Sequence, residues 1–188
     1  MLWTVPNLLT LFRIVLIPVL VLVYYLPFAW NHVAATALFG LAAVTDWFDG
    51  YLARRLGQSS PFGAFLDPVA DKLIVAVVLV LLVQRNPAWW FVVPASVIIG
   101  REIAVSALRE WMAEIGERAQ VAVSVIGKIK TTVQMIALVL LLYHAPVGPL
   151  PTRELGVICL YAAAILTLWS MGIYLKAAWP MLSRPAGH

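Results

Sequence analysis

The four aspartates of this chain are the residues best suited to chemistry. Asp46 and Asp49 are three residues apart, and Asp67 and Asp71 are four apart, so within helices each pair shares one face. Two carboxylate pairs on adjacent antiparallel helices repel each other strongly unless a cation neutralises them. Carboxylate oxygens are ligands that hard divalent ions prefer. The spacing therefore predicts a site for Mg²⁺ or Mn²⁺, and we expect two ions there.

The segment between the two pairs has further features of a binding site. Gly57 predicts the end of one helix, and Asp67 followed by Pro68 predicts the start of the next, with Asp67 as the N-cap. The positive end of that helix would favour anionic ligands. Gly50 and Gly63 lack side chains, so a nucleotide or phosphate could approach the backbone there, although close packing of membrane helices also explains them.

The elements that position these carboxylates are expected to be membrane helices. Apolar residues make up 63% of the 188 residues and charged residues 12%, whereas soluble domains have about 45–50% and about 25%. This composition excludes most soluble enzymes. Apolar stretches predict six helices, each close to the length of about 20 residues that spans a bilayer. They lie at residues 8–26, 33–52, 66–84, 88–107, 122–143 and 155–178. We therefore expect one all-α membrane domain, residues 1–188, built as a bundle of six transmembrane helices.

The basic residues indicate how this bundle is oriented, because they are retained on the cytoplasmic side of a membrane. In a six-span arrangement, every Lys and Arg except Arg85 and Arg153 falls on one side. Both termini are then expected to be cytoplasmic. The net charge of +4 suits a surface that faces anionic membrane lipids. No basic patch with interleaved aromatic residues lies outside the bundle, so we expect no nucleic-acid partner.

Several predicted helices carry charged groups in their cytoplasmic halves, including Arg101, Lys128 and Lys130 besides the aspartates. Charge is costly in hydrocarbon, so these groups are expected to face one another around water. This predicts a polar chamber open to the cytoplasm. A chamber on one side suits an enzyme. A divalent-cation transporter is the alternative, and it would need polar residues in both halves of the helices.

The acidic segment resembles the signature of a known family. It reads Asp46-x2-Asp49-Gly50-x2-Ala53-Arg54-x8-Gly63-x3-Asp67-x3-Asp71 and is similar, without departure, to that of the CDP-alcohol phosphatidyltransferases. Members of that family are six-helix membrane enzymes, usually homodimers, that displace CMP from a CDP-linked lipid or alcohol with the help of a divalent metal. The resemblance therefore implies a phosphatidyltransferase that uses Mg²⁺ or Mn²⁺ and forms a homodimer.

The wider sequence, from PNLLTLFRIVLIP to GKIKTTVQM, resembles one bacterial branch of the family. That branch joins CDP-diacylglycerol to sn-glycerol 3-phosphate. The resemblance implies those two substrates and a multi-pass position in the bacterial inner membrane, with the active site facing the cytoplasm. Another acceptor, such as inositol phosphate, serine or phosphatidylglycerol, is the nearest alternative, because the acidic signature does not separate acceptors.

The family pattern implies a role for each signature residue. The metal ligands would be Asp46, Asp49, Asp67 and Asp71. Asp71 would also be the catalytic base for the attacking hydroxyl. The pocket for CDP would be formed by Gly50, Ala53, Arg54 and Gly63. In that pocket Arg54 would pair with phosphate.

Near the N-terminus, Asn7, Thr10 and Arg13 follow one another at spacings of three and share one helical face. They resemble the N-terminal pattern of the bacterial branch, which implies that they line the nucleotide or phosphate side of the chamber. Asn7 and Thr10 are therefore candidates for CDP binding. The alternative is an N-cap, a packing hydroxyl and a snorkelling cation.

A phosphorylated acceptor requires a cationic pocket. The candidates are the basic residues that the fourth and fifth predicted helices place at their cytoplasmic ends, namely Arg101, Arg109, Lys128 and Lys130. Each could instead mark only the cytoplasmic boundary of its helix. We interpret Glu102 as a salt-bridge partner that orients one of these cations.

Overall fold

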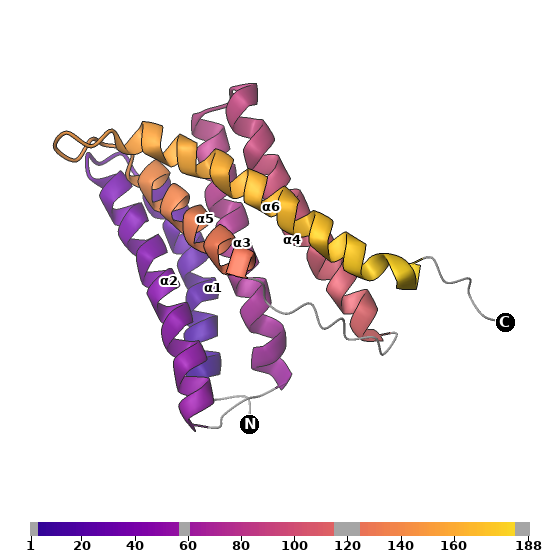
Figure 1. Cartoon of the computed structure of the whole chain (residues 1–188). Helices are drawn as coiled ribbons and strands as arrows, with labels where there is room; N and C mark the ends of the chain where they lie inside the picture. The colour runs from indigo at the N-terminus through magenta and orange to yellow at the C-terminus, as the bar shows by residue number, and fades with distance from the viewer. Residues whose placement is uncertain (1–3, 57–60, 115–124, 183–188) are drawn as a thin grey trace. The chain divides into compact units, whose positions relative to one another are not determined.

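The computed structural model describes residues 4–56, 61–114 and 125–182, and in these ranges the chain is helical without a strand (Figure 1). The helices are α1 (Val5–Tyr25), α2 (Asn31–Leu56), α3 (Pro61–Arg85), α4 (Trp89–Glu114), α5 (Val125–Tyr143) and α6 (Thr152–Leu182). The prediction of an all-α fold is therefore confirmed for the described residues. Each helix overlaps one of the six apolar stretches found in the sequence.

The start of α3 corrects one prediction. The helix begins at Pro61, so Asp67 is not its N-cap and Pro68 lies inside it. Both prolines are compatible with the first helical position, where the missing N–H has no intrahelical partner, and the chain uses the earlier one. Asp67 is then six residues into the helix, about 9 Å along its axis. The positive end of α3 is thus not placed at Asp67.

The chain divides into two compact units. Unit 1 comprises Met1–Arg85 and Leu138–Arg153, and unit 2 comprises Asn86–Ala137 and Glu154–His188. Helix α5 contributes its first part to unit 2 and its last part to unit 1. The single membrane domain over residues 1–188 stays a prediction.

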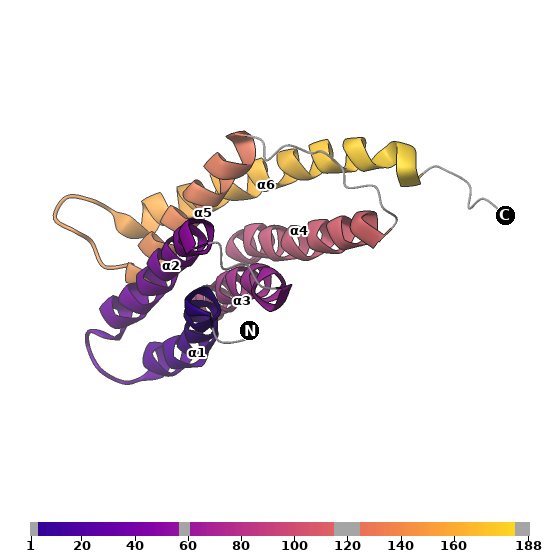
Figure 2. The same cartoon turned by 90° about the horizontal axis from the view of Figure 1, so that it is seen from below.

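In unit 1, α1 lies against both α2 and α3 (Figure 2). The connection from α1 to α2 is short, so the two helices run in opposite directions. Leu20 of α1, Phe39 of α2, and Val78 and Leu82 of α3 are buried. At the start of α1, the Thr4 hydroxyl accepts a hydrogen bond from the backbone N–H of Asn7 at 3.4 Å and caps the helix.

A histidine contact joins the end of α3 to the segment after α5. The Arg85 guanidinium lies 2.7 Å from Nε2 and 3.3 Å from Nδ1 of His144, and the His32 ring packs against the His144 ring with centroids 5.0 Å apart. Burial lowers the pKa of His144 below its ordinary value of 6.5, and the nearby positive charge of Arg85 acts in the same direction. His144 is therefore neutral at neutral pH.

In unit 2, α6 runs beside α4 (Figures 1 and 2). The Tyr161 hydroxyl of α6 donates a hydrogen bond to the backbone carbonyl of Trp90 on α4, which fixes one end of this pair. Phe91 and Ile98 of α4 and Leu160 of α6 are buried. The two helices thus have an apolar face in common at this end.

Three helices have apolar stretches long enough to cross a membrane among the described residues. They are Asn7–Tyr25, Trp89–Glu114 and Thr152–Lys176. Their surfaces expose large apolar side chains, such as Leu22, Ile103 and Trp169. Such surfaces need lipid or another apolar partner, so the chain is a membrane protein. The six-span bundle and its cytoplasmic chamber stay predictions.

Candidate active site

Two helices of unit 1, α2 and α3, bring carboxylates to one guanidinium group on α1. Arg13 of α1 donates to Oδ1 of Asp46 on α2 at 2.7 Å, and it also donates to Asp71 on α3. Its second terminal nitrogen lies 3.5 Å from Oδ1 of Asp67, also on α3. We call Arg13 with Asp46, Asp67 and Asp71 the acidic cluster. Arg13 and Asp71, which are 58 positions apart in the sequence, thus meet at this cluster, and the spacing of the aspartates did not predict that contact.

The polar face of α1 supports this cluster. Asn7, Thr10 and Arg13 are all buried, although they lie on a helix that is otherwise apolar. The Thr10 hydroxyl donates to Oδ1 of Asp67. Thr4 rather than Asn7 is the N-cap of α1, and Arg13 is buried rather than extended toward the surface. The alternative is therefore wrong for Asn7 as a cap and for Arg13 as a snorkelling cation, whereas the burial of Thr10 is compatible with a packing hydroxyl.

The charge of the acidic cluster is unbalanced. Three carboxylates surround one guanidinium, which leaves two negative charges in excess. The carboxylate side chains are 42–47% exposed, whereas that of Arg13 is 3% exposed. Each aspartate therefore has an accessible edge in addition to its contact with Arg13. Excess negative charge on accessible carboxylate oxygens fits binding of a hard divalent cation.

In the described residues, the carboxylates contact Arg13 and do not form a ligand shell for a metal ion. Among the residues that the structure describes, no group of three or more acidic, histidine or cysteine side chains is spaced to hold one ion. Asp49 belongs to α2, but its side chain lies outside the described part of the structure. The fourth predicted ligand is thus untested.

Most of the predicted CDP pocket lies in the same part of α2. The helix includes Gly50, Ala53 and Arg54, whose side chains and surroundings are outside the description. Gly63 belongs to the first turn of α3 and is buried. Burial of Gly63 agrees with both interpretations of this glycine, a close approach of substrate and close packing of helices.

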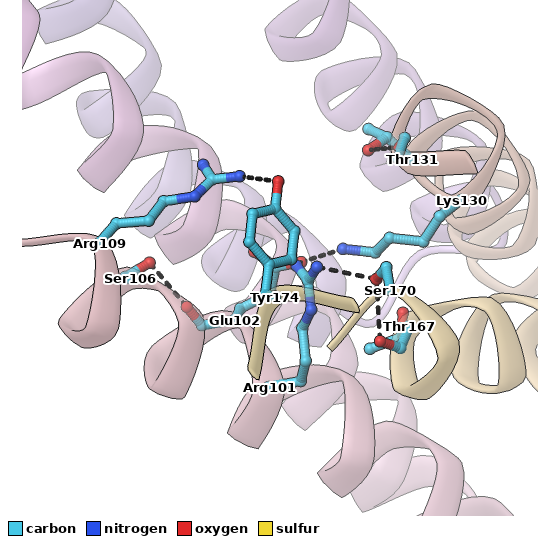
Figure 3. Close-up of polar contacts among 10 residues, drawn as sticks. Arg101, Glu102, Ser106, Arg109, Lys130, Thr131, Thr167, Ser170 and Tyr174 are labelled. Atoms are coloured by element: carbon cyan, nitrogen blue, oxygen red, sulfur yellow. Dashed lines mark hydrogen bonds and ion pairs between the residues drawn. The ribbon is translucent and has the colours of Figure 1, made fainter. Parts of the chain in front are cut away.

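A second polar cluster lies in unit 2, on α4, α5 and α6 (Figure 3). Its three cations are Arg101, Arg109 and Lys130, and we call them the cationic cluster. Arg101 donates to the Ser170 hydroxyl at 2.8 Å and lies 3.5 Å from Oε1 of Glu102. Lys130 also donates to Glu102. Glu102 is the salt-bridge partner that the sequence predicted, and one carboxylate for three cations leaves an excess of two positive charges.

Lys128 lies apart from this cluster. It precedes Lys130 by two residues on α5, so the two side chains point to different faces of the helix. Lys130 is buried and Lys128 is exposed. Within the described ranges, the ammonium group of Lys128 has no ion-pair partner.

Two residues of α6 were missed by the sequence analysis. The Tyr174 hydroxyl accepts a hydrogen bond from Arg109, and the Ser170 hydroxyl accepts one from Arg101 (Figure 3). The available signal was the spacing of Thr167, Ser170 and Tyr174, which places three hydroxyl groups near one face of an apolar helix. Such a polar stripe in a membrane helix indicates a functional surface.

Comparison with known proteins gives the family. A model of the family described as CDP-alcohol phosphatidyltransferase matches residues 3–169. The CDP-diacylglycerol--glycerol-3-phosphate 3-phosphatidyltransferase of Salmonella choleraesuis (strain SC-B67) is 55% identical over 176 residues, which cover 94% of this chain and 95% of that protein. Proteins of the same name from Escherichia coli (strain K12) and Shigella flexneri serotype 5b (strain 8401) are 56% identical over the same shares. The chain therefore belongs to the CDP-alcohol phosphatidyltransferase family.

Proposed function

We propose that this protein transfers the phosphatidyl group of CDP-diacylglycerol to sn-glycerol 3-phosphate, giving phosphatidylglycerophosphate and CMP. The observation that carries the proposal is the identity of 55–56% over 94% of the chain to proteins named for that reaction. The reaction would take place in the inner membrane of a bacterium, on its cytoplasmic side. Both termini would be cytoplasmic, and the working form would be a homodimer.

The acidic cluster would hold the divalent metal. Asp46, Asp67 and Asp71 would supply carboxylate oxygens, with Asp49 as the fourth ligand. The two negative charges in excess around Arg13 support this assignment, because a divalent cation would balance them. Mg²⁺ or Mn²⁺, as one or two ions, would neutralise the pyrophosphate and stabilise the charge that develops during transfer.

Asp71 would accept the proton of the attacking hydroxyl. The 1-hydroxyl oxygen of the acceptor would form a bond to the β-phosphorus of CDP-diacylglycerol, and the bond from that phosphorus to the bridging oxygen would break, releasing CMP. The hydroxyl proton would move to the Asp71 carboxylate, which must be ionised beforehand. The contact with Arg13 fixes the position of this carboxylate.

The CDP moiety would be bound by the signature residues between the aspartates. Gly50, Ala53 and Gly63 would allow close approach of the nucleotide, and Arg54 would pair with phosphate. Of the α1 residues proposed for the same pocket, Thr10 is engaged with Asp67. We assign Thr10, with Asn7, to the support of this side of the site.

The cationic cluster would bind the phosphate of the acceptor. Its excess of two positive charges matches a phosphate dianion, and the buried position of Arg101 and Lys130 would strengthen the attraction. In the described residues, the Nε of Arg101 is buried without a hydrogen-bond partner, so this guanidinium has a donor to spare. Lys128 is proposed for the same phosphate from its exposed position.

The experiment that tests this function is a panel of acceptors. Purified protein in detergent is given CDP-diacylglycerol and Mg²⁺, and CMP release is measured with sn-glycerol 3-phosphate, inositol phosphate, serine or phosphatidylglycerol. Of these acceptors, we expect only sn-glycerol 3-phosphate to give CMP release. Release with a different acceptor would correct the substrate, and no release with any acceptor would refute the proposal.

A further inference from the structure

We infer that Tyr174 is a positioning residue that holds Arg101 and Arg109 in the arrangement needed for the acceptor phosphate. The inference rests on the proposed function, because it concerns the same substrate. It gives a role to a residue of α6 outside the acidic signature and outside the predicted set of cations.

The geometry around Tyr174 shows two contacts with cations. The guanidinium carbon of Arg109 lies 4.8 Å from the centroid of the Tyr174 ring, and that of Arg101 lies 5.6 Å from it. Arg109 also donates a hydrogen bond to the Tyr174 hydroxyl (Figure 3). One aromatic side chain therefore contacts both arginines of the cationic cluster.

An aromatic ring can hold two arginines close together without reducing the positive charge of the cluster, whereas a carboxylate would reduce it. Two guanidinium groups beside one ring repel each other, and Arg109 is exposed, so its long side chain would otherwise move into solvent. The ring face attracts both cations through its quadrupole. Unlike a carboxylate, it adds no negative charge, so the cluster keeps its full attraction for phosphate.

Ser170 and Glu102 complete the frame for Arg101. Ser170 lies one turn before Tyr174 on α6, and its hydroxyl accepts from one terminal nitrogen of Arg101. Glu102 lies near the other terminal nitrogen. Arg101 is thus fixed from two sides, whereas Arg109 has Tyr174 as its contact in the described residues. The positioning role of Tyr174 should therefore act mainly through Arg109.

Steady-state kinetics of Tyr174→Leu and Tyr174→Phe test the inference. Losing the ring should raise KM for sn-glycerol 3-phosphate about 5- to 30-fold. The phenylalanine variant keeps the ring and loses only the hydroxyl, so its KM should rise less. In both variants kcat and KM for CDP-diacylglycerol should change less than about twofold. Trp169→Leu is the matched control, because it removes an exposed aromatic side chain of the same helix that lies outside the cationic cluster.

A double-substitution cycle separates positioning from packing. Since Tyr174 acts through Arg109, adding Tyr174→Leu to Arg109→Gln should raise KM for the acceptor less than about twofold further. Independent, multiplicative effects would overturn the inference. So would an unchanged acceptor KM in Tyr174→Leu, or a loss confined to kcat. If Tyr174→Leu does not fold, the test uses Tyr174→Phe instead. Adding Tyr174→Phe to Arg109→Gln must then raise the acceptor KM by a smaller factor than adding it to the wild-type protein.

The wild-type protein distinguishes the two levels of the proposal. If it releases no CMP with sn-glycerol 3-phosphate, the proposed function fails. If it does so and Tyr174→Leu keeps the wild-type acceptor KM, only the role of Tyr174 fails.

Discussion

Replacing Arg13 by glutamine removes the positive charge that, in the described part of the chain, three carboxylates share. The Arg13 side chain is 3% exposed, and its terminal nitrogens lie 2.7 Å from Asp46 and 3.5 Å from Asp67, with a third contact to Asp71. Without it, three carboxylates would face one another with no balancing charge from the residues that the structure describes. We expect the metal-free protein to be destabilised, and a divalent cation to compensate for much of the loss.

The magnitude follows from the geometry. One unit-charge pair about 4 Å apart contributes about 4 kcal/mol at an effective dielectric constant of about 20. The carboxylates are 42–47% exposed, so water screens part of this attraction. We therefore expect a loss of about 3 kcal/mol, the low end for removal of one partner of a buried pair. For a chain of this size, that lowers the melting temperature by about 6–12 °C.

The assay is thermal unfolding in detergent, with EDTA or with saturating Mg²⁺. In Mg²⁺ the loss caused by Arg13→Gln should be less than half of the loss in EDTA, because the cation neutralises the same carboxylates. Lys176→Gln is the control, since it removes one positive charge from an exposed site and should change stability by less than about 0.5 kcal/mol. Equal losses for Arg13→Gln in EDTA and in Mg²⁺ would refute the metal site at this cluster.

Three further predictions concern other residues. Asp71→Asn should lower kcat by about 10²- to 10⁴-fold while CDP-diacylglycerol still binds in Mg²⁺, as calorimetry would measure; loss of binding as well would make ligation its main role. Lys130→Ala should raise KM for sn-glycerol 3-phosphate about tenfold, more than Lys128→Ala does, because Lys130 is the buried one; the opposite order would place the phosphate at Lys128. The folded state resists protonation of His144, so stability should be complete above pH 6.5 and fall as the pH drops through the lower pKa of the folded state. His144→Gln should flatten this decline in thermal unfolding, and an unchanged decline would contradict the assignment.

The helices could be predicted because each is marked by a continuous apolar stretch. Their ends could not all be predicted, since end signals are local and sometimes repeated. At α3 the sequence offers Pro61 and Pro68 as starting points, and Asp67 makes the second more attractive. The chain begins the helix at Pro61, and it tolerates Pro68 inside.

The acidic cluster was predictable in part. Spacings of three and four residues place aspartates on one face of each helix, and the structure brings Asp46, Asp67 and Asp71 together as expected. The central position of Arg13 was not predictable, because it depends on how α1 is rotated against α2 and α3. That rotation is set by side-chain packing between helices, which no local pattern encodes.

The role of Tyr174 was hidden for a related reason. A tyrosine in an apolar helix is typical of a membrane interface, so its type carries little information. Only the packing of α6 beside α4 shows that its ring contacts Arg101 and Arg109. Which of Lys128 and Lys130 is buried likewise depends on the orientation of α5.

The most direct test of the central claim follows a label from acceptor to lipid. Purified protein with CDP-diacylglycerol and radiolabelled sn-glycerol 3-phosphate should move the label into the organic phase in Mg²⁺, with one CMP released for each label transferred. EDTA should stop both, and so should Asp71→Asn. Transfer that continues in EDTA, or CMP release without labelled lipid, would contradict a metal-dependent phosphatidyl transfer at the acidic cluster.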